Sequence, residues 1–153
     1  MRLKNASPGE KIFRHLDQLI YFSFLSGFGA KKINMKKTLV LGASDNPIRY
    51  SNAAVRRLAK EGFEVVPVGV REGEISGVPI QKGQPLLEGI HTITLYLNPQ
   101  RQKEYYGYVL GLQPRRIIFN PGAENPELMR LAQEKGIEVE MACTLVMLAV
   151  GQY

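Results

Sequence analysis

The stretch from Thr38 to Val55 constrains the fold more than any other part of the sequence. It begins with the apolar run TLVLGA, passes through the polar turn SDNP, and continues into IRYSNAAV, which has the composition of a helix start. An apolar strand that runs through a Gly-containing turn into a helix is the first half of a βα unit, the building block of a parallel sheet. Because the first amides of a helix lack partners and its dipole is positive there, such a turn favours an anion, most simply a phosphate. The turn matches neither GxGxxG nor the P-loop pattern, so it does not by itself identify the ligand.

The rest of the chain repeats this alternation of short apolar runs with amphipathic stretches. We therefore predict an α/β fold: a single Rossmann-like domain over residues 35–153, with a mainly parallel five-stranded sheet and helices on both faces. The expected strands are residues 38–43, 63–68, 92–97, 115–120 and 137–141, with a short edge strand at 78–80. The expected helices are residues 51–61, 100–112, 126–135 and 144–150.

Residues 1–34 look like an extension that precedes this domain. They carry six Lys or Arg and two acidic residues, so they contribute +4 of the formal net charge of +6. Their apolar residues have helical spacing, but Gly27 and Gly29 interrupt the pattern; the apolar positions are Ile12, Phe13, Leu16, Leu19 and Ile20. We expect a flexible or loosely helical extension, or an upstream stretch with the true start at Met35. Export is disfavoured because a small-x-small cleavage site is missing.

Composition excludes several functional classes. The domain itself carries only the remaining +2 and has no Arg-rich helix, which argues against nucleic-acid binding. The single cysteine, Cys143, excludes an internal disulfide and a cysteine-cluster metal site, and it suits the cytoplasm. No stretch approaches the roughly 20 apolar residues that span a bilayer, so no membrane association is expected.

In a parallel sheet, ligands bind beyond the carboxyl ends of the strands, where the strand order reverses. Small and hydrogen-bonding residues follow each predicted strand, although chain reversal alone also requires such residues. Agreement among several turns at one edge favours a binding site. The candidate cofactor-binding residues are Gly42, Ala43, Ser44, Asn46, Pro47, Arg49, Tyr50, Ser51, Gly69, Arg71, Asn98, Asn120, Pro121 and Gly122.

The residue after the second strand bears on the identity of the cofactor. Nicotinamide-binding domains usually have an acid there to bind the ribose hydroxyls. This chain has Arg71, which suits a phosphorylated ribose such as that of NADP or coenzyme A, although Glu72 and Glu74 lie close by and Arg71 could equally be a solvated loop charge.

Catalytic machinery is not evident. His15 lies in the extension, and His91 precedes a strand at the edge opposite to the expected site. Cys143 follows a strand and precedes a helix, where a thiol pKa can be lowered, but a lone cysteine is more often packed. No metal-binding or serine-nucleophile motif occurs. We therefore favour a protein that is not an enzyme, and metal ligands are not expected.

Four segments form a pattern in a fixed order along the chain: LGAS with NP and RYS at 41–51, VVPV at 65–68, FNPGAEN at 119–125 and EMACT at 140–144. Together they resemble the small stand-alone CoA-binding domain family, whose members are similar to the CoA-binding domain of the succinyl-CoA synthetase alpha subunit. The resemblance covers residues 35–153. It implies that the first turn holds the diphosphate of coenzyme A and that the exit of the second strand faces the adenosine. The usual Val-Asn-Pro after that strand is replaced by Val68-Gly69-Val70. The phosphorylated histidine that the synthetase uses, and the domain that carries it, have no counterpart here.

The sequence thus predicts a module that binds coenzyme A or an acyl-CoA through its first strand-turn-helix. The alternatives are an NADP-binding, oxidoreductase-like protein and a regulatory subunit whose ligand site has decayed. The expected partner is a small-molecule nucleotide cofactor, and a homodimer is allowed. The acyl group, the pathway and any role of Cys143 are left open.

Overall fold

The computed structural model describes residues 34–153, and side chains from Met35 onward. The expectations for the first 33 residues lie outside this range. The strands are β1 (Asn34–Leu41), β2 (Phe63–Gly69), β3 (Gly73–Ile75), β4 (Val78–Lys82), β5 (Thr92–Leu95), β6 (Arg116–Phe119) and β7 (Glu138–Met141). The helices are α2 (Tyr50–Lys60), α3 (Pro99–Gln102), the 3₁₀ turn η1 (Lys103–Tyr105), α4 (Tyr106–Gly111), α5 (Pro126–Glu134) and α6 (Thr144–Ala149).

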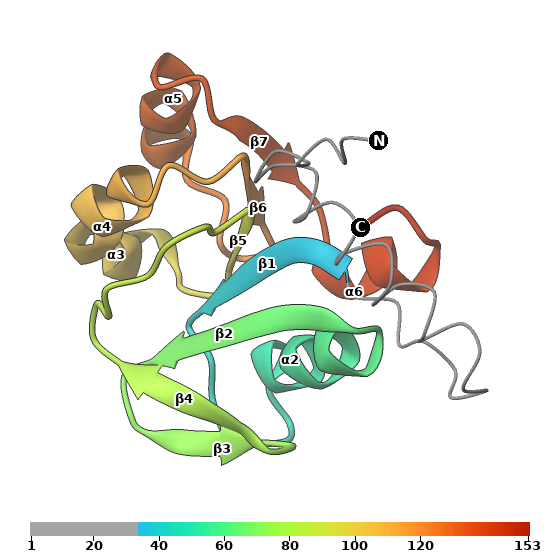
Figure 1. Cartoon of the computed structure of the whole chain (residues 1–153). Helices are drawn as coiled ribbons and strands as arrows, with labels where there is room; N and C mark the ends of the chain where they lie inside the picture. Colours follow the sequence, from blue (N-terminus) through green and yellow to red (C-terminus); the bar gives the residue numbers. More distant parts are fainter. Residues whose placement is uncertain (1–33) are drawn as a thin grey trace, which may run out of the picture. The chain divides into compact units, whose positions relative to one another are not determined.

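The strands form one sheet in the order β3-β4-β2-β1-β5-β6-β7 (Figure 1). All neighbouring pairs are parallel except β3 with β4, which are antiparallel. After β1, the chain forms β2, β3 and β4 on one side of β1. It then crosses to the other side of β1, where it forms β5, β6 and β7. The strand order therefore reverses between β1 and β5, which is where ligands bind in sheets of this kind.

Two apolar cores lie on opposite faces of the sheet, because alternate residues of β1 point to opposite sides. Leu39 and Leu41 belong to the core that includes residues of α4 and α5. Val40 belongs to the core that includes Val55 of α2 and Leu148 of α6. The predicted α/β class, with helices on both faces of a mainly parallel sheet, is confirmed.

Within residues 34–153, the sheet has seven strands rather than the expected five. The short edge strand expected at 78–80 is part of a complete hairpin formed by β3 and β4, with Glu74 opposite Pro79. Its second strand then pairs in parallel with the end of β2, where Val68 lies opposite Gln81. Pro79 is compatible with this arrangement because it lies near an edge of the sheet, where one missing donor is tolerated.

The expected helix at 100–112 is divided into α3, η1 and α4. Its first turn is fixed by Asn98, whose side-chain oxygen accepts a hydrogen bond from the Arg101 amide at 3.0 Å, and by Pro99 at the first helical position. The other predicted helices agree with the structure to within one or two residues. Among the helices of residues 34–153, none has the length and apolar character required to cross a membrane.

Candidate ligand-binding cleft

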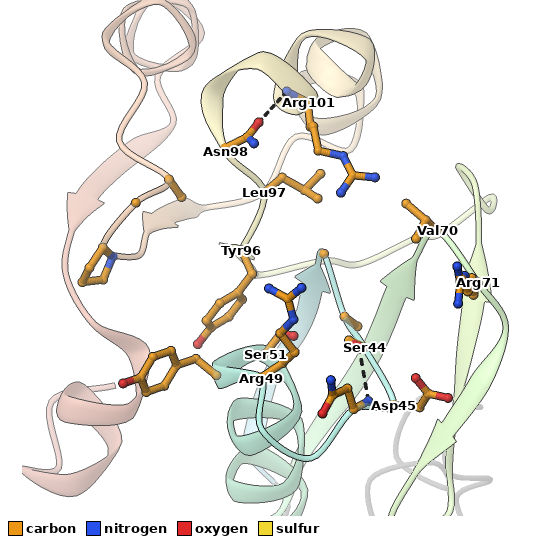
Figure 2. A pocket seen from close by; sticks show the side chains of 17 residues that line it. Ser44, Asp45, Arg49, Ser51, Val70, Arg71, Tyr96, Leu97, Asn98 and Arg101 are labelled. Carbon is orange, nitrogen blue, oxygen red and sulfur yellow. Dashed lines mark hydrogen bonds between the residues drawn. The ribbon is translucent and has the colours of Figure 1, made fainter.

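A cleft of about 790 Å³ opens at the carboxyl edge of the sheet, above the reversal between β1 and β5 (Figure 2). It is lined by the turn after β1, the start of α2, and the segments that follow β2, β5 and β6. Most of the predicted residues lie along it: Gly42, Ala43, Ser44, Asn46, Arg49, Tyr50, Ser51, Arg71, Asn98, Pro121 and Gly122. Residues predicted from separate turns are therefore brought together at one site.

The turn after β1 is held tightly against the neighbouring strands. The amides of Gly42 and Ala43 both donate to the carbonyl of Val68, each at 2.9 Å. Gly42 has a φ of 97°, and a Cβ there would lie 3.0 Å from the backbone carbon of Tyr96. Only glycine fits this conformation and this close approach.

Some backbone amides of the predicted anion-binding turn are already bonded to side chains of the same turn. The Asn46 amide donates to Ser44 Oγ at 3.2 Å, and the Ile48 amide donates to Asn46 Oδ1 at 3.1 Å. The Asn52 side chain ties the loop to α2 by donating to the carbonyls of Ser44, at 3.0 Å, and Asp45, at 3.1 Å. These bonds fix the shape of the turn, and they remove the Asn46 and Ile48 amides from those available to a ligand.

The first amides of α2 are the ones that remain available. Arg49 occupies the N-cap position and its side chain makes no capping bond, and the first turn of the helix has no acidic residue. Within the described part of the chain, the amides of Tyr50 and Ser51 have no hydrogen-bond acceptor. An anion placed above them would gain both donors and the positive end of the helix dipole.

Three arginines from three different segments line the cleft: Arg49 at the start of α2, Arg71 after β2, and Arg101 in α3. Asp45 is the only acidic residue in the lining. Figure 2 shows Arg49 and Arg101 extending into the cleft from opposite walls, with Arg71 beside the exit of β2. Among residues 35–153, none of the three guanidinium groups forms an ion pair. The cleft therefore offers unneutralised positive charge to an anionic ligand.

Tyr96 contributes a phenol ring to the floor of the cleft. Its hydroxyl oxygen is buried and has no hydrogen-bond partner among the described residues, although the hydroxyls of Thr94 and Thr144 lie nearby and bond to each other at 2.7 Å. Burial raises the pKa of Tyr96 to about 12, an effect that the neighbouring Thr144 hydroxyl only partly opposes. The phenol is therefore protonated at neutral pH.

Three of the predicted residues lie outside the cleft lining. Pro47 is exposed on the turn. Gly69 is buried, and a Cβ there would lie 2.4 Å from the Ala43 carbonyl oxygen, so this glycine allows β2 to approach the turn. Asn120 is also buried; it donates to Thr94 Oγ1 at 2.7 Å and to the Leu95 carbonyl at 3.0 Å, and accepts from the Thr144 amide at 2.8 Å. Gly69 and Asn120 therefore support the walls of the cleft from behind.

Sequence reasoning missed six lining residues: Asp45, Val70, Tyr96, Leu97, Arg101 and Ala123. Tyr96 and Leu97 fall in the strand predicted at 92–97, but β5 ends at Leu95, so both residues belong to the loop that follows it. Their place in the lining follows from where the strand ends, which was predicted two residues too late. Arg101 had a weak signal, because it follows the helix-starting pair Asn98-Pro99 at the ligand-binding edge.

The other candidate groups lie elsewhere. His91 lies at the amino end of β5, where its Nδ1 is 2.9 Å from Thr92 Oγ1, and burial together with Arg116 lowers its pKa. Cys143 occupies the N-cap of α6 and does not line the cleft. The described residues contain no group of three or more His, Cys, Asp and Glu side chains placed to hold a metal ion. His15 lies outside the described residues.

The sheet order and the position of the cleft define a Rossmann-like α/β domain with a cleft at its topological switch point. The profile of a family described as "CoA binding domain" matches residues 36–149. The chain belongs to this CoA-binding domain family, as the sequence resemblance predicted.

Solved structures agree with this assignment. A crystal structure of an uncharacterized protein is 49% identical, with a TM-score of 0.76, and the match covers 78% of this chain and 99% of that one. A hypothetical protein from Pyrococcus horikoshii OT3 is 26% identical, with a TM-score of 0.66 and coverage of 72% and 80%. The Thermus thermophilus protein ID.343, at 23% identity, has the same fold, with a TM-score of 0.68 and coverage of 90% and 98%. A comparison of the sequence with curated proteins found no match.

Proposed function

We propose that this protein binds coenzyme A, free or as an acyl-CoA, in the cleft at the carboxyl edge of the sheet. Membership of the CoA-binding domain family supports the ligand class. In this proposal the diphosphate lies on the turn after β1 and the first turn of α2, where the Tyr50 and Ser51 amides donate to it and Arg49 neutralises it. The observation that carries the proposal is that these unpaired amides and the unpaired Arg49 side chain face one cleft.

The adenosine end would lie toward the exit of β2. Val70 is half exposed there and offers an apolar surface to a base, and Arg71 follows it. An arginine fork matches phosphate geometry well, so Arg71 suits the 3′-phosphate of coenzyme A. This assignment leaves the pantetheine arm to run toward Pro121 and Gly122, at the exit of β6.

Two alternatives share parts of this geometry. Arg71 also suits the 2′-phosphate of NADP, which would make the protein oxidoreductase-like. A regulatory subunit with a decayed site would keep the fold and bind neither ligand. Catalysis has no assigned residue in the proposal, since His91 and Cys143 lie outside the cleft lining.

Calorimetric titration of the full chain with coenzyme A, acetyl-CoA, NADP and NAD tests the proposal. We expect saturable binding of coenzyme A and acetyl-CoA, with NADP and NAD weaker by at least about tenfold, a difference of about 1.4 kcal/mol. Tighter binding of NADP would support the oxidoreductase-like alternative. Binding of none of the four would contradict the proposal and favour a decayed site.

The variant Ser44→Glu tests the location. Its carboxylate would lie where the diphosphate is proposed to bind, and juxtaposed like charges cost several kcal/mol, so we expect at least a hundredfold loss of affinity for coenzyme A. Gln133→Glu, which adds the same charge on the exposed face of α5, serves as the control and should bind normally. Undiminished binding by a folded Ser44→Glu protein would show that the diphosphate lies elsewhere.

A further inference from the structure

Arg101 faces Arg49 across the cleft, and the binding mode proposed above gives it no role. The two residues come from opposite walls, α3 and the start of α2 (Figure 2). Both side chains are exposed, and neither forms an ion pair among residues 35–153. Two guanidinium groups that share a cleft repel each other when it is empty, so an anion held between them would relieve this repulsion as well as gain two donors.

The backbone that carries Arg101 is fixed by buried contacts. Asn98 accepts from the Arg101 amide at 3.0 Å and so caps α3. The next residue, Gln102, is fully buried, and its side-chain nitrogen donates to the carbonyls of Leu97, at 2.8 Å, and Ala123, at 2.7 Å. Its side-chain oxygen accepts from Asn125 Nδ2 at 2.9 Å. Gln102 therefore links two segments that line the cleft, and Arg101 projects from an anchored turn rather than a free loop.

We propose, on the footing of the coenzyme A site proposed above, that Arg101 binds the diphosphate from the side opposite to Arg49. The two guanidinium groups then form a clamp on the linked phosphates, while Arg71 binds the separate phosphate on the ribose. The site selects a nucleotide that carries a diphosphate bridge and a ribose phosphate together. Gln102 acts as a positioning residue for this clamp.

The different roles proposed for the three arginines follow from their positions in the cleft. Arg49 and Arg101 line the cleft at the switch point between β1 and β5, together with Tyr50 and Ser51. Arg71 lies beyond β2, on the far side of β1 from β5. In the proposal, the linked diphosphate therefore bridges Arg49 and Arg101, and the separate ribose phosphate binds Arg71.

Calorimetry with two ligands separates these roles. Coenzyme A and dephospho-CoA share the diphosphate, and only the former has the 3′-phosphate. We expect Arg101→Gln to weaken both ligands by a similar factor, about ten- to a hundredfold, because a charge-assisted hydrogen bond is lost. Arg71→Gln should weaken coenzyme A and leave dephospho-CoA unchanged. Raising the salt concentration should narrow the gap between wild type and Arg101→Gln, since screening weakens an exposed charge.

Lys103→Gln is the matched control, because it removes one positive charge two residues away at an exposed position outside the cleft lining. It should bind coenzyme A as the wild type does. Arg101→Lys, which keeps the charge, should lose less affinity than Arg101→Gln. Since the Arg101 side chain is exposed, circular dichroism and the melting temperature should not change in these variants.

The outcomes distinguish this inference from the function on which it rests. Wild-type protein that binds neither ligand would overturn the proposed function itself. Binding by wild type that Arg49→Gln weakens and Arg101→Gln leaves intact would overturn only the clamp. A loss in Arg101→Gln confined to coenzyme A would also overturn the clamp, because Arg101 would then bind the 3′-phosphate.

Discussion

At the scale of the residue, the shape of the cleft depends on two glycines with different tasks. Gly42 has a positive φ and lies against the backbone of Tyr96. Gly69 is needed for space, because the Ala43 carbonyl oxygen occupies the position that a side chain would take. The turn that is proposed to hold the diphosphate can therefore approach β2 only if residue 69 lacks a Cβ.

Gly69→Ala should consequently disturb both stability and binding. The new Cβ would overlap the Ala43 carbonyl oxygen, so the backbone of β2 or of the turn must shift. We expect a loss of about 1–3 kcal/mol in the free energy of unfolding, the usual cost of overpacking, together with weaker coenzyme A binding. Urea denaturation and calorimetry measure the two effects. Gly107→Ala is the control: a Cβ there meets nothing within 4 Å, and alanine in a helix should stabilise the protein by about 0.5–1 kcal/mol. Equal effects of the two substitutions would contradict the steric argument.

Tyr96 provides a pH-dependent prediction. Its pKa in the folded protein is raised from 10.0 to about 12, so the unfolded chain loses this proton first as the pH rises. The associated stability is fully present below pH 10 and is lost as the pH rises toward 12, with about 1 kcal/mol lost between pH 10 and 11. Tyr96→Phe removes this loss and also removes the unpaired hydroxyl. We expect the variant to be at least as stable as wild type at pH 8, and its advantage to be larger by about 1.4 kcal/mol at pH 11. An unchanged difference in melting temperature at the two pH values would show that Tyr96 ionises normally.

At the scale of the element, α3 is held in place mainly by one buried side chain. Replacing Gln102 with Leu keeps an apolar body in the same space but leaves the Leu97 and Ala123 carbonyls and Asn125 Nδ2 without this partner. Unsatisfied buried polar groups cost about 1–3 kcal/mol each, and Asn125 retains its bond to the Tyr106 hydroxyl, so we expect a total loss of about 2–4 kcal/mol. Gln100→Leu, at an exposed position of the same helix, should change stability by less than about 0.5 kcal/mol. Chemical denaturation compares them, and equal stability of the two variants would show that the buried bonds are dispensable.

The same element shows where sequence reasoning succeeds and where it stops. The strands at 38–43 and 63–68 could be predicted because their apolar runs end at glycine and enter helices. The division of the helix at 100–112 could not, because local apolar periodicity does not distinguish one helix from two short helices joined by a 3₁₀ turn. Likewise, β4 becomes part of the sheet only by pairing with β2, a contact between segments that local periodicity does not encode.

For the molecule as a whole, the candidate site could be predicted in part because the sheet topology brings its residues together. A parallel sheet brings the carboxyl ends of its strands to one edge, so turns that are far apart in the sequence could be assigned to one cleft. The same rule could not distinguish residues that line the cleft from residues that support the lining from behind. Asn120 and Gly69 occupy the right turns and are buried behind the lining, and Arg101 enters from a helix that the rule does not orient.

Tyr153 lies at the opposite edge of the sheet, where it connects the segment after α6 to the amino ends of several strands. Its ring packs edge-on against Phe63 of β2, with centroids 4.9 Å apart, and the Arg116 guanidinium lies 4.8 Å above it. Its hydroxyl lies 2.9 Å from Thr38 Oγ1, and Lys36 Nζ donates to its carbonyl oxygen at 2.7 Å. Arg116 is buried, and one of its terminal nitrogens has no hydrogen-bond partner in the described part of the chain, so the ring is an important part of its environment.

Tyr153→Ala should therefore destabilise the entire domain without affecting the ligand site. It removes the ring from Phe63 and from Arg116 together, and we expect a loss of about 2–4 kcal/mol in a single cooperative transition. Tyr153→Phe keeps the ring and loses only the bond with Thr38, so about 1 kcal/mol should be lost. Because the cleft lies at the other edge of the sheet, coenzyme A affinity should be unchanged in both variants at temperatures where they are folded. The phenylalanine variant can be measured even if the alanine variant fails to fold. If Tyr153→Phe is less stable than wild type by as much as 3 kcal/mol, the hydroxyl rather than the ring provides most of the stabilisation. Loss of affinity in folded Tyr153→Phe would show instead that the two edges of the sheet are coupled.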